Sequence, residues 1–247
     1  LKLLFLIGKK RSGKDTTADY IMDNYNATKH QLAGPIKDAL ADAMLTEWYR
    51  DTSREFPRIT RSMIEGIDYD REQDLNLSTK DVIRIMANAI EYVHHDLPLP
   101  GVVYDNKRKI LDGDTMEVIR KVVINKPVEP WSIRRLMQTL GTDIVCDKLD
   151  RMYWVKRFTL VMADTFGDYD YFIVPDTRQD HELDVARAMG ATVIHVVRPE
   201  QEGSKKDTHV TERGLPIREG DIVITNDGSL EELYSKINTI LGIQNDY

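Results

Sequence analysis

The 247-residue sequence has one cysteine, no long apolar run and no excess of positive charge. A single cysteine, Cys146, excludes an internal disulfide and is typical of a reducing compartment. The formal net charge of −7 argues against a general binder of nucleic acids or membrane surfaces, although a local basic pocket can still bind an anionic substrate. Because the sequence has neither an apolar run of about 20 residues nor a signal-peptide pattern, we expect a cytoplasmic protein with no membrane and no nucleic-acid partner.

Several common catalytic patterns are missing as well. His94 and His95 lack the spacing of metal ligands, and the segment "DHELD" lacks the second histidine of a metalloprotease helix. The sequence shows no serine nucleophile elbow, no Cys–His arrangement and no guanine-selecting N-K-x-D. These absences leave phosphate binding as the chemistry with the clearest signal.

Apolar runs alternate with amphipathic segments along most of the chain, which predicts an α/β fold with a parallel sheet and right-handed crossovers. The runs expected to form strands are residues 1–7, 29–33, "YFIVPD", "ATVIHVV" and "DIVIT". The segments expected to form helices are residues 15–25, the stretch after Gly34-Pro35, the segment capped by Ser132, residues 149–166, "QDHELDVARAMG" and residues 230–241.

Residues 51–130 are more polar and have a mixed pattern. We expect a helix near residues 80–92 and a β hairpin around residues 102–124. The sequence therefore predicts one domain over residues 1–247, with an insertion at about 51–130 that covers the core.

The segment "GKKRSGKDTT" directly follows the first apolar run and directly opens a helix. Gly8, Gly13 and Lys14 match the pattern of a phosphate-binding loop, in which glycines turn backbone N–H groups toward the anion and the lysine reaches the β- and γ-phosphates. Asp15 stands where a hydroxyl normally ligates Mg²⁺; a carboxylate can also serve the metal, and Thr16 supplies a hydroxyl. Arg11 can stabilise charge that develops on the transferred phosphoryl group. The alternative is a solvated, glycine-rich turn.

A second set of polar groups follows the strand "YFIVPD", which ends in Asp176. Ligands of open α/β sheets bind at the carboxyl ends of the strands, where a carboxylate can organise Mg²⁺. Thr177 and Arg178 follow at once and add a hydroxyl and a guanidinium. The alternative is a helix N-cap with a surface arginine.

A third set lies in "WSIRRLMQTLGTD" and "DRMYW". Arg135, Gln138 and Thr142 share one helix face, where they can bind a phosphate and read a base edge, or simply face solvent. Trp154 can stack on a base or belong to the core. Lys37, after Gly34-Pro35, is positioned for an anion or is a surface lysine, and Arg71 in "DYDRE" is a weaker candidate.

Together the segments "GKKRSGKDTTADYIM", "QLAGPIKDALA", "EGIDYDRE", "RRLMQTLGTD", "DRMYWVK" and "VPDTRQDHE" resemble the deoxynucleoside monophosphate kinases of T-even bacteriophages. Asp15 after the loop lysine is part of that family pattern. The resemblance implies a P-loop nucleoside monophosphate kinase-like fold, ATP and Mg²⁺ as cofactors, and deoxynucleoside monophosphates such as dGMP, dTMP and a cytosine-derived nucleotide as acceptors. It also implies a homodimer in the cytoplasm of the infected host.

The same resemblance implies residue roles, which we list by site. ATP would be held by Lys10, Ser12, Gly13, Lys14, Asp15 and Thr16, and the metal by Asp15 and Asp176. The acceptor would be bound by Lys37, Arg71, Arg135, Gln138, Gly141, Thr142, Trp154, Asp176, Thr177 and Arg178. The catalytic groups would be Lys14, Arg11, Asp15, Arg135 and Asp176, and the segments with His209 and Asn226 resemble parts near the nucleotide.

Two other functions fit part of the pattern. A phosphomevalonate kinase-like enzyme shares a similar "SGKD" loop and a "DTR" after a strand. A nucleotide-binding module that is not a kinase would need the phosphate-binding loop but none of the acceptor-binding residues. The amide and the indole near residues 135–154 favour a nucleotide acceptor, and the extra cations of the loop suit phosphoryl transfer.

Overall fold

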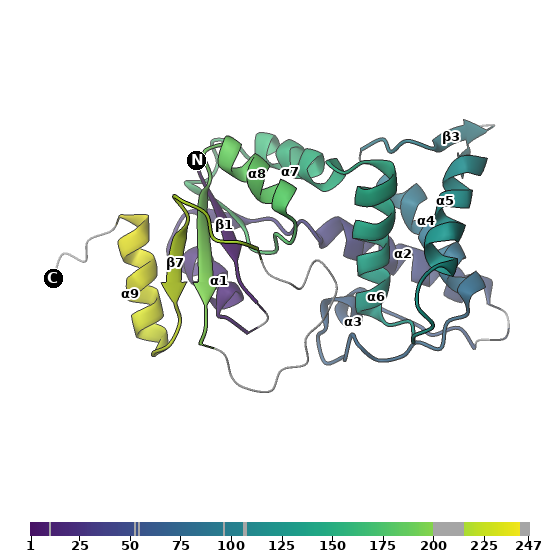
Figure 1. Ribbon diagram of the computed structural model, residues 1–247, viewed down its shortest axis with the longest axis horizontal. Helices are drawn as coiled ribbons and strands as arrows, with labels where there is room; N and C mark the ends of the chain where they lie inside the picture. Colours follow the sequence, from purple (N-terminus) through teal and green to yellow (C-terminus); the bar gives the residue numbers. More distant parts are fainter. Residues whose placement is uncertain are drawn as a thin grey trace. The chain divides into compact units, whose positions relative to one another are not determined.

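The computed structural model describes residues 1–9, 11–51, 53, 55–95, 97–105, 108–199 and 215–242. The chain forms two compact units (Figure 1). The first unit consists of Leu1–Leu32 and Phe158–Tyr247, and the second consists of Ala33–Arg157. The expected insertion at residues 51–130 lies inside the second unit, which also includes the residues on both sides of it.

The first unit contains a five-stranded sheet in which all strands are parallel. The strand order is β2-β5-β1-β6-β7. The strands are β1 (Lys2–Ile7), β2 (Ala27–Lys29), β5 (Tyr171–Val174), β6 (Thr192–Val197) and β7 (Ile222–Thr225). The predicted α/β class with a parallel central sheet is confirmed.

Strand β1 is apolar from Leu3 to Ile7 because both faces of the sheet are covered by helices (Figure 1). Leu4 and Leu6 pack with residues of α1 and α9, whereas Leu3, Phe5 and Ile7 pack with residues of α7 and α8. These helices are α1 (Lys14–Asn24), α7 (Tyr153–Asp164), α8 (Asp180–Ala188) and α9 (Leu230–Leu241).

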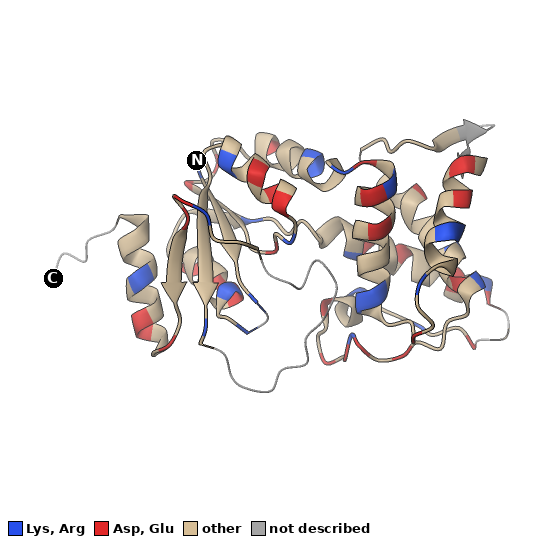
Figure 2. Cartoon of the chain, viewed as in Figure 1, with Lys and Arg blue, Asp and Glu red and all other residues tan. Residues whose placement is uncertain are grey.

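The second unit is mainly helical, and its core lies between helices with apolar inner faces. Its helices are α2 (Gly34–Arg50), α3 (Arg61–Glu65), α4 (Thr79–Val93), α5 (Gly113–Ile124), α6 (Ile133–Gln138) and the π-helix η1 (Thr139–Leu149). Its two strands, β3 (Val102–Asp105) and β4 (Arg108–Leu111), form an antiparallel hairpin. Acidic and basic residues are interspersed on these helices (Figure 2).

Three predicted elements differ from the structure. The hairpin expected around residues 102–124 ends at Leu111, because the Asp112 carboxylate accepts a hydrogen bond from the Thr115 N–H (2.7 Å) and caps helix α5. The strand expected at residues 29–33 is β2, which ends at Lys29 since α2 already begins at Gly34. The helix expected from residue 149 begins at Tyr153, after the π-helix.

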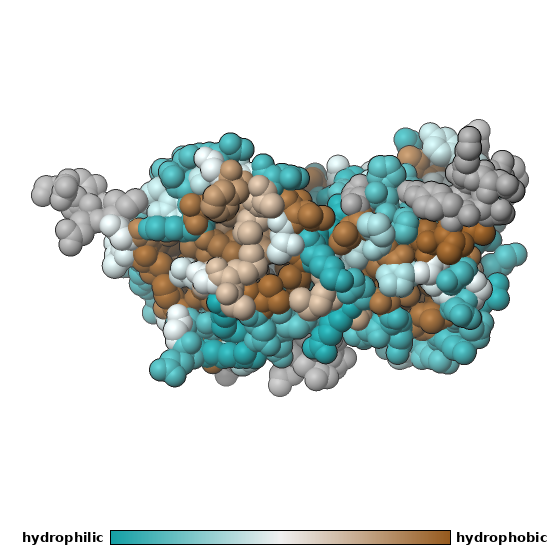
Figure 3. Space-filling view, turned by 90° about the horizontal axis from the view of Figure 1, so that it is seen from above, coloured by the Kyte–Doolittle hydropathy of each residue, from teal (hydrophilic) through white to brown (hydrophobic). Residues whose placement is uncertain are grey.

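The surface is mixed in polarity. Figure 3 shows apolar side chains that reach one face in several places between hydrophilic ones. In the part of the chain that the structure describes, no helix combines the length and the apolar character needed to cross a membrane.

Candidate active site

The loop at residues 8–14 leaves the end of β1 and turns into the first residue of α1, Lys14. Gly13 is the N-cap of that helix and has φ = 101°, a conformation that favours glycine. A Cβ at Gly8 would lie 2.3 Å from the Ser12 Oγ, and a Cβ at Gly13 would lie 2.3 Å from the Asn226 Nδ2. Both glycines are therefore required by close approach, as a tightly curled phosphate-binding loop demands.

Asn226 holds this loop from the end of β7. Its Nδ2 donates a hydrogen bond to the Ser12 carbonyl (2.8 Å), and its own N–H donates to the Val197 carbonyl (2.7 Å). The Thr17 hydroxyl donates to the Gly13 carbonyl (3.0 Å) and fixes the first turn of α1. The loop is thus shaped by backbone and by neutral side chains. Two predicted nucleotide-site residues, Lys10 and His209, lie outside the described residues.

The charged groups of the loop differ in their exposure. The Lys14 side chain is 11% exposed, and its Nζ lies 2.5 Å from the Oδ1 of Asp15, which is 82% exposed. Arg11 is exposed, has φ = 66° and forms no ion pair with any residue that the structure describes. Thr16 is half-buried in the first turn of α1. The charge of Lys14 is therefore neutralised by Asp15, whereas Arg11 is exposed to solvent.

The turn after β5 carries the second set of predicted residues. Because β5 is the parallel neighbour of β1, the Asp176 turn and the loop follow strands that end at the same edge of the sheet. The Asp176 Oδ1 accepts a hydrogen bond from the Leu32 N–H (2.8 Å). The Thr177 hydroxyl is buried and has no hydrogen-bond partner among the described residues.

Glu182 holds the same turn from helix α8. Its Oε2 accepts hydrogen bonds from the N–H groups of Arg178 (2.8 Å) and Gln179 (3.0 Å). Burial raises the pKa of Glu182 to about 7, even though the two N–H groups favour the charged carboxylate. The charge of Asp176 also raises this pKa. A buried carboxyl group is thus committed to fixing the backbone that presents Asp176, Thr177 and Arg178.

These features fit a nucleoside triphosphate with Mg²⁺. The loop offers backbone next to glycines that tolerate no side chain, and the buried hydroxyls of Ser12 and Thr177 have no protein partner in the described part of the chain. Among those residues, no group of three or more His, Cys, Asp or Glu side chains is arranged to hold a metal. A Mg²⁺ ion would therefore take most of its ligands from phosphate oxygens and water, as Mg²⁺ usually does.

In the second unit, Lys37 lies in the first turn of α2 and is only 6% exposed. Its Nζ lies 2.5 Å from the Glu65 Oε2, and Arg61 contacts the other oxygen, Oε1. The Arg61 Nε also lies 2.7 Å from the Asp38 Oδ1. Burial alone would raise the pKa of Glu65, but hydrogen bonds from Lys37 and Arg61 outweigh it and hold the pKa below its usual value.

Arg135 follows the predicted N-cap Ser132, whose hydroxyl accepts a hydrogen bond from the Arg135 N–H (3.3 Å). The guanidinium donates to the carbonyls of Pro127 (2.6 Å), Pro130 (3.2 Å) and Glu129 and lies 4.2 Å from the centre of the Trp131 ring. It is therefore occupied by backbone oxygens. Arg71 accepts a hydrogen bond at its backbone carbonyl from the Arg134 N–H (3.1 Å).

The π-helix contains Gly141 and Thr142, and π-helices are rare elements that often occur at functional sites. The Trp154 Nε1 donates a hydrogen bond to the Gly141 carbonyl (2.9 Å), and the indole is only 3% exposed. A Cβ at Gly141 would lie 2.5 Å from the Ile36 Cδ1. Thr142 is buried, and the buried Nε2 of Gln138 has no hydrogen-bond partner in the described residues.

The environments of Trp154 and Gln138 can be compared with the roles predicted for them. The faces of Trp154 are covered, so the structure places the indole in the core, which was one of the two expected readings. The side chain of Gln138 keeps a buried donor for which the protein supplies no acceptor in its described part. Arg61, Glu65 and Glu182 were not predicted, although the i, i+4 spacing of Arg61 and Glu65 on one helix is a signal that could have found that pair.

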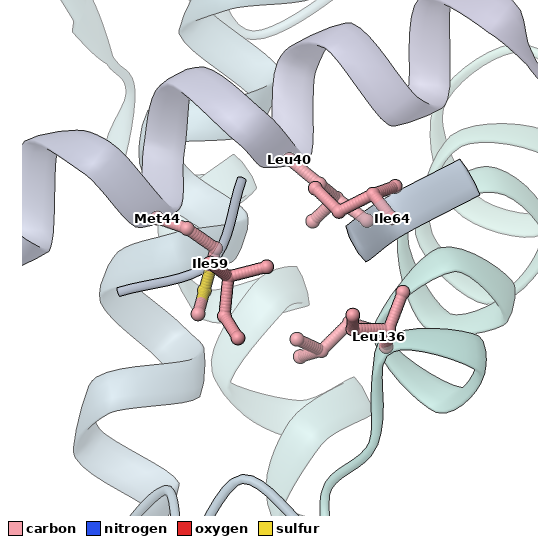
Figure 4. A pocket seen from close by; sticks show the side chains of 6 residues that line it. Leu40, Met44, Ile59, Ile64 and Leu136 are labelled. Carbon is pink, nitrogen blue, oxygen red and sulfur yellow. The ribbon is translucent and has the colours of Figure 1, made fainter. Parts of the chain in front are cut away.

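A small apolar recess lies between residues of α2, α3 and α6 in the second unit (Figure 4). It offers no space wide enough for a water molecule. An apolar recess cannot bind a phosphate, and none of the predicted site residues lines it. The lining residues are Leu40, Met44, Ile59, Ile64, Ile133 and Leu136.

The family model for deoxynucleotide monophosphate kinase matches residues 2–237. The chain belongs to the deoxynucleotide monophosphate kinase family. It is 57% identical over 248 residues to the deoxynucleotide monophosphate kinase of Enterobacteria phage T4, covering 98% of this chain and 100% of that one. It is 53% identical over 250 residues to the enzyme of the same name from Escherichia phage RB69, with the same coverage. The resemblance seen in the sequence is confirmed.

Proposed function

We propose that this chain transfers the γ-phosphoryl group of ATP to a deoxynucleoside 5′-monophosphate, giving ADP and the deoxynucleoside diphosphate. The observation that carries the proposal is membership of the kinase family over nearly the whole chain, with relatives of that name at 57% and 53% identity. The curled loop between β1 and α1 supports ATP as the donor, because its close-packed glycines suit a polyphosphate.

The donor is held by the loop residues Lys10, Ser12, Gly13, Lys14, Asp15 and Thr16. Lys14 and Arg11 neutralise negative charge that develops on the transferred group. The nucleophile is a phosphate oxygen of the acceptor, which is already anionic near neutral pH. Catalysis therefore depends on alignment and charge stabilisation and needs no strong general base.

Asp15 and Asp176 are the proposed ligands of Mg²⁺. The metal, when bound, screens the charge of the donor phosphates. Asp15 is exposed and paired with the adjacent Lys14, whereas Asp176 is anchored by the Leu32 N–H. Glu182 fixes the turn that carries Asp176 and Arg178.

The acceptor is bound mainly by the second unit. Lys37, Arg71 and Arg135 supply positive charge, and Gln138 supplies a buried amide that can read a base edge. Trp154 holds the Gly141 carbonyl and so shapes the turn of the π-helix that contains Thr142. Thr177 and Arg178, in the turn after β5, are also proposed to contact the acceptor.

Several finer points belong to the same proposal. The acceptors are dGMP, dTMP and a cytosine-derived deoxynucleotide, and the enzyme acts as a homodimer in the cytoplasm of the infected host. The chain works as one catalytic domain in which residues 51–130 cover the substrates. Covering is needed because water must be kept from the donor phosphate.

An ADP-release assay tests the proposal against its alternatives. The panel contains deoxy- and ribonucleoside monophosphates, phosphomevalonate and a reaction without acceptor. We expect rapid ADP formation only with deoxynucleoside monophosphates. ADP formation with phosphomevalonate would support a small-molecule kinase, and equal ADP formation without any acceptor would support a nucleotide-binding module that only hydrolyses ATP.

A further inference from the structure

One carboxylate in the second unit is held by two cations from different helices. Glu65, at the end of α3, contacts the Lys37 Nζ of α2 through Oε2 (2.5 Å) and the Arg61 guanidinium through Oε1. Lys37 and Arg61 therefore contact different oxygens of the same carboxylate. Lys37 is almost fully buried, whereas the side chains of Arg61 and Glu65 are 35% and 30% exposed.

This arrangement matches what an oxyanion of phosphate requires. Arginine binds carboxylates and phosphates through the same planar fork of N–H donors, and lysine adds a point charge. A buried ammonium without a partner is costly, so some anion has to face Lys37 whether or not a substrate is present. In the substrate-free protein that anion is Glu65.

We propose that the Glu65 carboxylate occupies the position of the acceptor's phosphate, and that a deoxynucleoside monophosphate binds by replacing this carboxylate on Lys37 and Arg61. The inference rests on the proposed function and adds two residues to it. Arg61 becomes a phosphate-binding residue. Glu65 becomes an internal competitor of the acceptor's phosphate, so it lowers the affinity for the deoxynucleotide and favours ligands with more negative charge than a carboxylate.

The exchange favours a phosphomonoester for an electrostatic reason. A phosphomonoester carries a charge of about −1.5 to −2 at pH 7, against −1 for the carboxylate that it replaces. A nucleoside without phosphate has no group that can displace Glu65. The released carboxylate lies at the exposed end of α3 and can turn to water, because it is already partly exposed.

The first test is Glu65→Gln, with Michaelis constants measured for a deoxynucleoside monophosphate and for ATP. Removing the competing charge should lower the KM for the deoxynucleotide about 3- to 10-fold, and the KM for ATP should not change. Glu117→Gln is the matched control, since it removes one negative charge from an exposed i, i+4 pair in the same unit. A higher KM for the deoxynucleotide in Glu65→Gln would overturn the proposal and make Glu65 a tether of Lys37.

The second test is Arg61→Met, which leaves Glu65 and Lys37 in place and keeps the test informative if Glu65→Gln does not fold. The KM for the deoxynucleotide should rise about tenfold, and Arg61→Lys should recover part of the loss. Competition by the corresponding nucleoside should be unchanged, because it has no phosphate. An unchanged KM in Arg61→Met would contradict the proposal. If the unmodified protein phosphorylates no deoxynucleotide at all, the proposed function fails instead.

Discussion

The two units position their candidate substrate-binding groups by different means. In the first unit, the loop at residues 8–14 is shaped by two glycines that admit no Cβ and by Asn226, a neutral side chain. In the second unit, Lys37 is held by Glu65 of another helix and Arg135 by carbonyls of residues 127–130. Lys14 of the donor loop is paired with the exposed carboxylate of its neighbour Asp15. The difference implies that the backbone of the donor loop needs little rearrangement, whereas in the acceptor region the substrate must replace partners from other segments of the chain.

Two carboxyl groups, Glu182 in the first unit and the partly exposed Glu65 in the second, differ in what holds them. Glu182 in the first unit is held by backbone N–H groups, and burial raises its pKa to about 7. Glu65 in the second unit is held by two cations, which lower its pKa. Glu182 therefore fixes the backbone of a turn, whereas Glu65 neutralises the charges of Lys37 and Arg61.

The largest effect is expected from Lys14→Ala in the donor loop. Removing one preorganised charge that stabilises a transition state typically costs 10²- to 10³-fold in kcat, so we expect a loss of about that size. The affinity for the deoxynucleotide should not change, because Lys14 lies in the donor loop and is not among the proposed acceptor-binding residues. Lys29→Ala, which removes an exposed cation of the same unit, is the control. Substantial residual turnover in Lys14→Ala would refute the donor assignment.

The next largest effect is on the pH dependence of stability, which should differ between variants of Glu182 and Glu65. The folded-state pKa of Glu182, about 7, lies above its ordinary 4.5, so its contribution to stability is fully present below about pH 4.5 and is lost as the pH rises to 7. The shift corresponds to a loss on the order of 3 kcal/mol in the free energy of unfolding. Thermal melts at pH 5 and pH 7.5 should therefore show that Glu182→Gln removes a decline seen in the unmodified protein.

Glu65→Gln should change the melts in the opposite sense. The lowered pKa of Glu65 means that its contribution is present above the ordinary carboxyl range and is lost as the pH falls. The variant should thus be less stable at pH 7.5 and close to the unmodified protein at low pH. If the two variants shift in the same direction, the contrast between the two carboxyl groups is wrong.

A smaller effect is expected from Asn226→Ala. The change leaves the Ser12 carbonyl without its 2.8 Å partner, and losing such a buried hydrogen bond costs about 1–3 kcal/mol. Since the loop holds the donor, the KM for ATP should rise about tenfold, a change of about 1.4 kcal/mol, with the KM for the deoxynucleotide unchanged. Steady-state kinetics with each substrate varied in turn measures both values. A rise confined to the deoxynucleotide would show that Asn226 shapes a different site.

The smallest effect is expected from Trp154→Phe, which keeps an aromatic ring and removes the N–H that binds the Gly141 carbonyl. One hydrogen bond is worth about 1 kcal/mol, so the KM for the deoxynucleotide should rise about fivefold. Because the ring is buried, the rise should be equal for purine and pyrimidine acceptors. A rise that depends on the base would mean that Trp154 stacks on it.

The sequence predicts the positions of those site residues that directly follow a strand in the chain. Gly8, Gly13 and Asp176 follow buried strands, and that order alone predicts where they lie in a parallel sheet. The contacts of Asn226 with Ser12 and of Glu65 with Lys37 join residues far apart in the chain, so no local pattern reveals them. The pattern of residues 102–124 predicts a hairpin throughout, but the Asp112 cap starts helix α5 at Gly113.

The π-helix could not be predicted for a related reason. Most of residues 139–149 are buried, Gly141 lies against Ile36, and the Gly141 carbonyl accepts a hydrogen bond from the Trp154 Nε1. Such contacts depend on the packed core. The sequence predicts the helix that Ser132 caps and another helix from residue 149, but it does not predict the π-helix that joins them.

ATP and the deoxynucleotide are proposed to bind through separate sets of residues, ATP in the first unit and the deoxynucleotide mainly in the second. A decisive experiment is equilibrium titration of a non-hydrolysable ATP analogue and of dGMP into Asn226→Ala and Arg61→Met. We expect Asn226→Ala to weaken binding of the ATP analogue alone and Arg61→Met to weaken binding of dGMP alone. Equal losses of both ligands in both variants would show that the two sets of residues are not separate.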